Sequence, residues 1–205
     1  HSPYDQNKTM SHLVDTCSFD KTISKAIVKC DENLELYFEK IKGMPSYNNT
    51  IFIVTGDHNI GDLKLKNPLE TFHVPLIIYS PQLQKTDDFY SVVTHRDVTP
   101  SLYSLLEENY NLSISESVTY VGGQLNVSEK FETINKTSLC LYHESRFPNL
   151  IHDDFFLMGN EVYKIKDSLL DCSRVINDSL RRELINKRIE YQKQDQVGLD
   201  RGLYP

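Results

Sequence analysis

The sequence lacks the features that mark membrane-spanning and nucleic-acid-binding proteins. No apolar run in its 205 residues approaches the ~18 to 20 residues that a bilayer span needs, and no basic-then-apolar leader opens it. It contains no Lys/Arg-rich run and has a net charge of −7, so it has no positive stripe for a phosphate backbone. We therefore expect no membrane segment in this chain and no nucleic-acid partner.

Cysteines are also scarce, and the usual motifs of nucleophilic catalysis are missing. Four scattered cysteines without a Cys-x-x-Cys pair argue against a disulfide scaffold and against a zinc or redox motif. We expect buried thiols at these four positions. They are Cys17, Cys30, Cys140 and Cys172. Gly-x-Ser-x-Gly, Ser-x-x-Lys and phosphate-cradling glycine loops are absent, so the sequence offers no identifiable nucleophile.

What the sequence does contain is a short apolar run that ends in two metal-ligand residue types. Residues 51–54 are β-branched or aromatic without alternating polarity, which predicts a strand buried on both faces. Gly56 then breaks the strand, and Asp57 and His58 follow. Open α/β sheets keep their ligands just beyond the carboxyl ends of strands. This junction is therefore the predicted site, although an Asp-His pair taken alone can also be structural or incidental.

The predicted site combines an oxygen ligand with a nitrogen ligand. An imidazole nitrogen shifts the expected metal from calcium or magnesium towards manganese, zinc or iron. Two adjacent residues cannot make a tight site alone, so further ligands must come from elsewhere. His73 and His95 lie near predicted strand ends and are each either surface histidines or site residues. Asp97 is better explained as a helix cap.

The segments around this junction predict alternating strands and helices, which is typical of βαβ units. An amphipathic helix is expected from Asp20, as N-cap, to about residue 41, packing on the sheet. A second buried strand is predicted at 74–79 and a brief one at 92–94. The next helix is expected to begin at Asp97 or Thr99, with Pro100 in its first turn.

Beyond about residue 109 the pattern changes to short strands. These are predicted at 138–142, 154–158 and 161–165, the last two joined by a two-residue turn at Gly159-Asn160. A final helix is predicted at 175–192, with a solvated charged face. The expected fold class is α/β, with a mainly parallel sheet flanked by helices and a small antiparallel C-terminal addition.

Four segments, taken in order, resemble the alkaline phosphatase superfamily, and most of all its sulfatase-like phosphoglycerol transferases, which include the lipoteichoic acid synthases. The segments are Thr50-Ile-Phe-Ile-Val-Thr-Gly-Asp-His58, His73-Val-Pro-Leu-Ile-Ile-Tyr-Ser-Pro81, Thr94-His-Arg-Asp-Val-Thr-Pro-Ser-Leu102 and Gly122-Gly-Gln-Leu125. The sequence departs from the family pattern at Asn59, Ser101 and Gln124, and none of these departures removes a ligand. The resemblance covers roughly residues 1–125.

The resemblance implies roles for individual residues. Asp57 and His58 would be two protein ligands of the catalytic metal, with manganese or zinc as the expected ion. His1, in His-Ser-Pro-Tyr, would contact the phosphoryl group or the substrate headgroup, and His73 is a second candidate for substrate binding. The family's nucleophile, a further acidic ligand and the membrane helices would all lie before His1, so no catalytic nucleophile is expected in this chain.

The resemblance also implies a domain organisation and a function. Residues 1–125 would be the C-terminal half of a sulfatase-like catalytic domain, and residues 126–205 an α+β subdomain packed on it. The parent would be a membrane-anchored, extracytoplasmic enzyme of the bacterial cell envelope, and this chain alone would be inactive. Together with its missing N-terminal half, it would act on phospholipid- or glycan-linked phosphodiesters through a covalent phospho-enzyme. A sulfatase is the alternative within the fold, and a non-catalytic binding module is the alternative outside enzymes.

Overall fold

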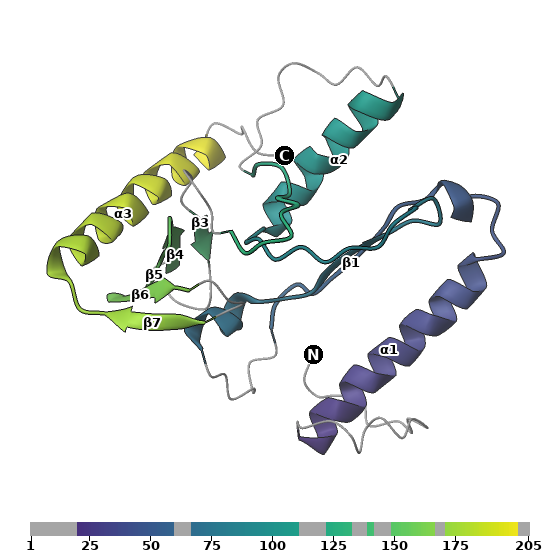
Figure 1. Ribbon diagram of the computed structural model, residues 1–205, viewed down its shortest axis with the longest axis horizontal. Helices are drawn as coiled ribbons and strands as arrows, with labels where there is room; N and C mark the ends of the chain where they lie inside the picture. The colour runs from purple at the N-terminus through teal and green to yellow at the C-terminus, as the bar shows by residue number, and fades with distance from the viewer. Residues whose placement is uncertain are drawn as a thin grey trace. The chain divides into compact units, whose positions relative to one another are not determined.

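A computed structural model describes most of the chain (Figure 1). The described residues are 20–59, 67–110, 122–132, 139–141, 149–166 and 171–200. The chain forms two compact units, and each is described by itself. The first unit comprises His1–Val54 and Leu76–Lys85, and the second comprises Thr55–Pro75 and Thr86–Pro205.

The first unit begins with helix α1, Lys21–Ile41, which confirms the predicted helix and its cap. The side chain of Asp20 accepts a hydrogen bond of 2.8 Å from the backbone N–H of Thr22. That bond satisfies one of the donors that the first turn of a helix leaves unpaired. It also lowers the pKa of the Asp20 carboxyl, because the bond favours the charged form.

The buried face of α1 differs from the predicted one in the first half of the helix. Ile23 and Ile41 are buried as expected, but Ser24 and Val28 are buried where the helical spacing had favoured Ile27 and Cys30. Ile27 and Cys30 are exposed, so the prediction of a buried thiol is wrong for Cys30. Apolar residues occur on both sides of this part of the helix, so periodicity alone could not choose between them.

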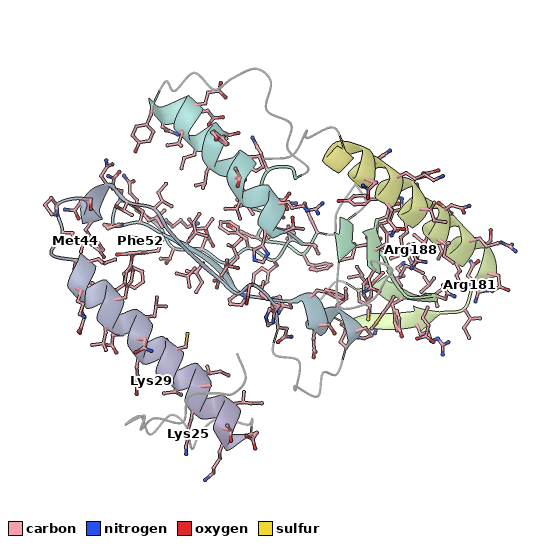
Figure 2. All side chains as sticks on the ribbon, turned by 180° about the vertical axis from the view of Figure 1, so that it is seen from behind. Lys25, Lys29, Met44, Phe52, Arg181 and Arg188 are labelled. Carbon is pink, nitrogen blue, oxygen red and sulfur yellow. The ribbon has the colours of Figure 1, made fainter. Side chains whose placement is uncertain are left out.

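Two short strands complete the first unit. They are β1, Phe52–Thr55, and β2, Leu76–Tyr79, which form a two-stranded sheet. The single-turn 3-10 helix η2, Tyr47–Asn49, precedes β1. The ring of Phe38 on α1 contacts the rings of Phe52 and Tyr79, with centroids 5.2 and 5.7 Å away. The predicted packing of α1 on the sheet is therefore confirmed. Phe52 is labelled in Figure 2.

The burial of these strands is much lower than predicted. The residues of β1 are half-buried or exposed, and three of the four residues of β2 are exposed. Ile77 retains 55% of its accessible surface and Ile78 retains 41%. The predictions of a strand buried on both faces at 51–54 and of a second buried strand at 74–79 are therefore wrong for the described residues.

The second unit contains a five-stranded antiparallel sheet in the order β3-β4-β5-β6-β7. Its strands are β3, Leu139–Leu141, β4, Asn149–His152, β5, Phe155–Met158, β6, Glu161–Ile165, and β7, Cys172–Val175. The predicted strands correspond to β3, β5 and β6. The sequence analysis missed β4 and β7, so the antiparallel addition is larger than expected.

Both faces of this sheet are covered within the unit. On one face Leu150, Leu157 and Val162 form a buried cluster with Leu184 of helix α3, Asp178–Asp200. On the other face Ile151, Phe156 and Ile165 form a cluster with Leu69 of the 3-10 helix η3, Pro68–Phe72. Neighbouring residues of each strand divide between the two clusters, as the two-residue period of a strand requires.

The hairpin turn between β5 and β6 has the predicted two residues. Gly159 has φ +59°, a conformation that glycine adopts without strain. Its N–H donates to Asn149 Oδ1 at 3.2 Å, and its carbonyl accepts from Arg188 Nη1 at 2.8 Å. Arg188 is 6% exposed and is labelled beside the sheet in Figure 2. The turn is therefore fixed by β4 on one side and by α3 on the other.

Helix α2, His95–Tyr110, begins earlier than predicted. Thr94 Oγ1 accepts from Arg96 N, and Asp97 Oδ2 accepts in return from Thr94 N at 2.7 Å, which is a capping box. Asp97 is therefore a capping residue as predicted, but from inside the helix. Pro100 lies beyond the first turn, and the predicted strand at 92–94 is not a strand. Residue 92 instead donates its N–H to the carbonyl of Glu132.

The class is α/β, as predicted, and it includes the expected antiparallel strands. Helix α3 begins three residues after the predicted start, because Val175 belongs to β7. Ile176, which was expected on the apolar side of that helix, precedes it and is 92% exposed. None of the helices in the described residues is both long and apolar enough to span a bilayer. The domain boundary near residue 125 stays a prediction.

Candidate metal centre

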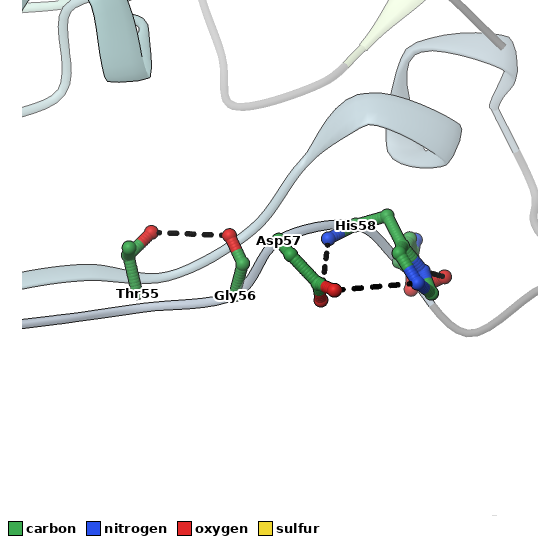
Figure 3. Close-up of polar contacts among 5 residues, drawn as sticks. Thr55, Gly56, Asp57 and His58 are labelled. Atoms are coloured by element: carbon green, nitrogen blue, oxygen red, sulfur yellow. Dashed lines mark hydrogen bonds and ion pairs between the residues drawn. The ribbon is translucent and has the colours of Figure 1, made fainter. Parts of the chain in front are cut away.

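The candidate centre lies where β1 ends and the chain bends at Asp57 and His58 (Figure 3). One carboxylate oxygen of Asp57, Oδ1, accepts a hydrogen bond of 2.9 Å from the backbone N–H of His58. The other, Oδ2, lies 3.6 Å from His58 Nε2. The two side chains are 80% and 62% exposed. A carboxylate oxygen and an imidazole nitrogen are thus held together and open to solvent.

The imidazole ring of His58 is oriented by the next peptide group. Its Nδ1 lies 2.8 Å from the carbonyl oxygen of Asn59. A carbonyl oxygen can only accept, so Nδ1 carries the proton in this bond. In the neutral ring the lone pair is then on Nε2, the nitrogen beside Asp57. Histidines that bind metals are typically held in this way, with the second ring nitrogen donating to a carbonyl or carboxylate.

The spacing of the two ligand atoms fits one divalent ion. With metal–ligand bonds near ~2.1 Å, neighbouring ligand atoms on one ion lie about 3.0 to 3.4 Å apart. The observed 3.6 Å differs by a few tenths of an ångström, which a small rotation of an exposed side chain supplies. Within the described residues, no group of three or more His, Cys, Asp or Glu side chains is placed to hold a metal. Asp57 and His58 therefore fit a metal as a partial set of ligands.

A second pair in the chain shows that the spacing alone is not diagnostic. His152 Nε2 lies 3.7 Å from Asp153 Oδ2, almost the same separation. The His152 side chain is only 15% exposed, at the end of β4, and Asp153 has φ +47° in the turn to β5. What distinguishes the pair at 57–58 is therefore the accessibility of both side chains and the oriented Nε2 lone pair.

Asn59 anchors the bend to η3. Its side-chain Nδ2 donates to the carbonyl of Glu70 at 2.5 Å. The helix η3 is in turn capped by Asn67, whose Oδ1 accepts from Leu69 N at 2.9 Å, and it is packed into the core of the antiparallel sheet through Leu69. The bend that carries the two candidate ligand residues is thus tied to the buried core of the second unit.

The start of β7 contributes a further contact to η3. The thiol of Cys172 donates to Asn67 Oδ1 at 3.1 Å. Burial raises the pKa of this thiol, which keeps it protonated and therefore able to donate. Cys172 is half-buried and behaves as a structural thiol.

His95, the first residue of α2, reaches the end of β1. Its Nε2 lies 2.9 Å from Thr55 Oγ1, two residues before Asp57. The Thr55 hydroxyl also donates to the carbonyl of Gly56 at 3.3 Å. The sequence left His95 undecided between surface and site. The structure places it against Thr55, two residues before the candidate centre.

The segment at 122–125 lies along the first turns of α2. Gly123 N donates to Asp97 Oδ1 at 2.8 Å, and Leu125 N donates to Ser101 Oγ at 2.7 Å. Gly122 approaches the carbonyl of Arg96 so closely that a Cβ would clash with it. Pro100 has no N–H to donate to that carbonyl, so α2 departs here from regular helical bonding. Two of the four segments that carry the family resemblance, 94–102 and 122–125, therefore pack on each other.

The other predicted site residues are placed as follows. His73 is exposed and follows η3, where its N–H donates to the carbonyl of Glu70 at 3.2 Å. Its role in substrate binding stays a prediction. His1 lies outside the described residues. Sequence reasoning missed the contribution of Asn59, and an Asn directly after Asp-His was its only signal.

Comparisons with known proteins agree with this fold. A family model described as Sulfatase matches residues 1–108. The chain is also similar to a solved structure described as a protein in the alkaline phosphatase superfamily from Vibrio parahaemolyticus, with a TM-score of 0.56 and 17% identity. That similarity covers 100% of this chain and 48% of the other, so the chain spans about half the length of that structure. No curated protein matches the sequence.

The family match extends over 108 of the 205 residues and includes β1, β2 and the candidate ligand pair. The structural similarity independently gives the same superfamily's fold over the whole chain. The chain belongs to the sulfatase family, within the alkaline phosphatase superfamily.

Proposed function

We propose that the chain supplies two ligands, Asp57 and His58, to the metal of an enzyme that transfers or hydrolyses phosphodiesters. The observation that carries the proposal is the orientation of the His58 ring. Its Nδ1 donates to a backbone carbonyl, which leaves Nε2 as a metal ligand 3.6 Å from the Asp57 carboxylate. Members of this superfamily typically use divalent metals, which agrees with a ligand pair at this place.

The ligand types favour manganese or zinc over calcium, because imidazole nitrogen suits the transition metals and carboxylate-only sites suit calcium. A metal bound there would activate a hydroxyl nucleophile and stabilise the charge that develops on the transferred group. The chain's own residues would hold the carboxylate and the imidazole in place through Asn59. His1 and His73 would contact the substrate.

The nucleophile would come from an upstream half of the same catalytic domain. In that arrangement a Thr, Ser or Cys side chain attacks the phosphorus, the leaving alcohol departs, and the covalent phospho-enzyme passes its group to an acceptor. We propose a phospholipid- or glycan-linked phosphodiester as substrate, with a phosphoglycerol- or phosphoethanolamine-type group transferred. The parent would be membrane-anchored and extracytoplasmic.

Hydrolysis of sulfate esters is the second candidate. It is favoured by the match of residues 1–108 to the Sulfatase family model. The two candidates differ in metal as well as in substrate, because a calcium site would gain little from the imidazole of His58. A third reading, a binding module without catalysis, would be favoured if the parent lacked a nucleophile and an acidic ligand before His1.

Calorimetric titration of the 205-residue chain with zinc, manganese and calcium tests the ligand assignment. Two protein ligands leave most of the coordination shell to water, so we expect dissociation constants of roughly micromolar to millimolar, about −8 to −4 kcal/mol. His58→Ala should weaken zinc binding much more than calcium binding. His152→Ala is the matched control, because it removes the histidine of the other closely spaced Asp-His pair and should change nothing.

Calcium binding that is tight and insensitive to His58→Ala would overturn the assignment and favour the sulfatase candidate. The parent enzyme then decides the reaction, assayed with a chromogenic phosphodiester and a chromogenic sulfate ester. The 205-residue chain alone should turn over neither. Turnover by this chain that disappears in Asp57→Ala would contradict the placement of the nucleophile upstream.

A further inference from the structure

We infer that His95 is a positioning residue of the candidate metal centre, because through Thr55 it fixes the peptide group from which Asp57 extends. The proposed function leaves two of the four segments that carry the family resemblance, 94–102 and 122–125, without a role. Both segments lie at the first turns of α2, whose first residue is His95. The inference rests on the proposed function only for what the bend holds, which is a metal ion.

Two consecutive hydrogen bonds connect His95 to the bend. His95 Nε2 lies 2.9 Å from Thr55 Oγ1, and the Thr55 hydroxyl donates to the carbonyl of Gly56 at 3.3 Å (Figure 3). A hydroxyl has a single proton to donate, so both bonds form together only when His95 Nε2 carries a proton and donates it. His58 instead donates through Nδ1. In their neutral forms the two histidines thus have opposite tautomers, one suited to hold a neighbour and the other to bind a metal.

The second of these bonds constrains Asp57, because the peptide group is planar. The carbonyl of Gly56 and the N and Cα atoms of Asp57 belong to one peptide unit, which rotates only as a whole. Holding that carbonyl therefore limits the directions in which the Asp57 side chain can extend. On the other side of the ligand pair, the side chain of Asn59 donates to the carbonyl of Glu70. The two candidate ligands are thus held from both sides, by α2 before them and by η3 after them.

The turn that carries His95 is itself held by the two segments. Thr94 and Asp97 form the capping box of α2. The other carboxylate oxygen of Asp97 accepts from Gly123 N at 2.8 Å. The side chain of His95 is exposed, so its place depends on the backbone of this turn. The capping box and segment 122–125 therefore supply the rigid support that a positioning residue needs.

Two variants that differ by one methylene group test the inference. In His95→Gln the side-chain amide nitrogen takes the place of Nε2 and donates to Thr55 Oγ1, whereas in His95→Asn the same amide is too short to reach. Calorimetric titration of the 205-residue chain with zinc compares them. We expect His95→Gln to bind within about twofold of wild type and His95→Asn to bind roughly fivefold more weakly, as the loss of one exposed hydrogen bond implies.

Removing the other partner of the bond should have the same effect. Thr55→Val deletes the hydroxyl and should weaken zinc binding by the same factor, and adding His95→Asn to it should weaken binding no further. Tyr191→Phe is the matched control. It removes the hydroxyl that accepts from Arg96 Nη1 at 2.7 Å, on the same turn as His95, and leaves the bond to Thr55 intact. Its zinc affinity should equal that of the wild type.

Backbone order parameters from nitrogen relaxation, measured without metal, separate this inference from the proposed function. The amides of Asp57 and His58 should be rigid in the wild type, with order parameters of ~0.85. His95→Gln and Tyr191→Phe should leave these values unchanged. His95→Asn and Thr55→Val should lower them towards ~0.6, because the Gly56–Asp57 peptide is then free to rotate.

Equal zinc affinities of His95→Gln and His95→Asn would overturn the positioning role, even if zinc binds at Asp57 and His58. Order parameters that neither His95→Asn nor Thr55→Val lowers would overturn it as well. Zinc binding that is insensitive to His58→Ala would instead overturn the metal assignment. In that case the order parameters, which need no metal, would still decide the role of His95.

Discussion

The two sheets of this chain contain similarly apolar strands and differ in what covers them. In the antiparallel sheet Phe156 and Leu157 are fully buried, because η3 lies on one face and α3 on the other. In the β1–β2 pair Ile77 and Ile78, which point to opposite faces, both remain exposed among the described residues. An apolar strand thus indicates that a sheet is to be covered. Whether it is covered depends on elements elsewhere in the polypeptide.

The largest expected effect tests this contrast directly. Phe156→Ala should destabilise the chain by about 3 to 5 kcal/mol, because it opens a cavity in a closed core. Phe52→Ala should cost only about 1 to 2 kcal/mol, since its ring is half-buried and loses less surface from water. Urea unfolding followed by circular dichroism measures both. Equal losses would contradict the contrast between the two sheets.

A smaller effect is expected at α2, which has no buried residue and is held largely by polar contacts. Gly122→Ala should destabilise by about 1 to 3 kcal/mol, because the added methyl would overlap the backbone carbonyl of Arg96. Gly123→Ala is the control. A Cβ there would meet nothing nearer than Asp97 Oδ1 at 4.0 Å, so a change within about 0.5 kcal/mol is expected. Similar losses at both glycines in thermal unfolding would contradict this account.

The next prediction concerns the link between the closed sheet and the candidate metal centre. Asn59→Ala removes the bond to the Glu70 carbonyl and frees the peptide that orients His58. We expect zinc affinity to fall roughly tenfold while stability changes little. Asn109→Ala deletes a similar bond, from an Asn side chain to the Leu105 carbonyl, and should leave zinc affinity unchanged in calorimetry. If zinc affinity is unaffected by Asn59→Ala, the anchoring role is wrong.

The smallest effect is expected at the cap of α1, in the sparsely covered unit. The backbone bond from Thr22 lowers the pKa of Asp20 below its ordinary 3.8, so the charged form stabilises the folded state. This contribution is present above pH 3.8 and is lost as the pH falls through the folded-state pKa. Asp20→Asn keeps a cap but removes the charge. Its melting temperature should therefore lie slightly below wild type at neutral pH and should converge with it in acid.

Local signals allowed much of the fold to be predicted. The cap at Asp20, the Gly159-Asn160 turn and the apolar run before Asp57 each act through a few neighbouring residues, and each was found where predicted. The start of α2 was readable in the same way, from Thr94 and Asp97 at capping-box spacing, but Pro100 drew the prediction further along the chain.

Features that depend on distant partners were not predictable. The segment Cys-Ser-Arg-Val forms strand β7 only because it pairs with β6. The orientation of His58 depends on Asn59, whose anchor at Glu70 lies 11 residues further along the chain. The low burial of β1 and β2 was unpredictable for the same reason. An apolar pattern shows that a strand can be buried, but it does not show which other elements pack on it.

The two hydrogen bonds that hold Gly159 have a consequence for the order of folding. The hairpin of β5 and β6 joins residues close in sequence and can form within microseconds, as isolated hairpins do. Arg188 lies 29 residues beyond the turn and reaches the Gly159 carbonyl only after α3 has docked. The same peptide unit therefore takes part in an early local event and in a late non-local one. Its carbonyl is a natural position for an isotope-edited infrared label that separates the two steps in time.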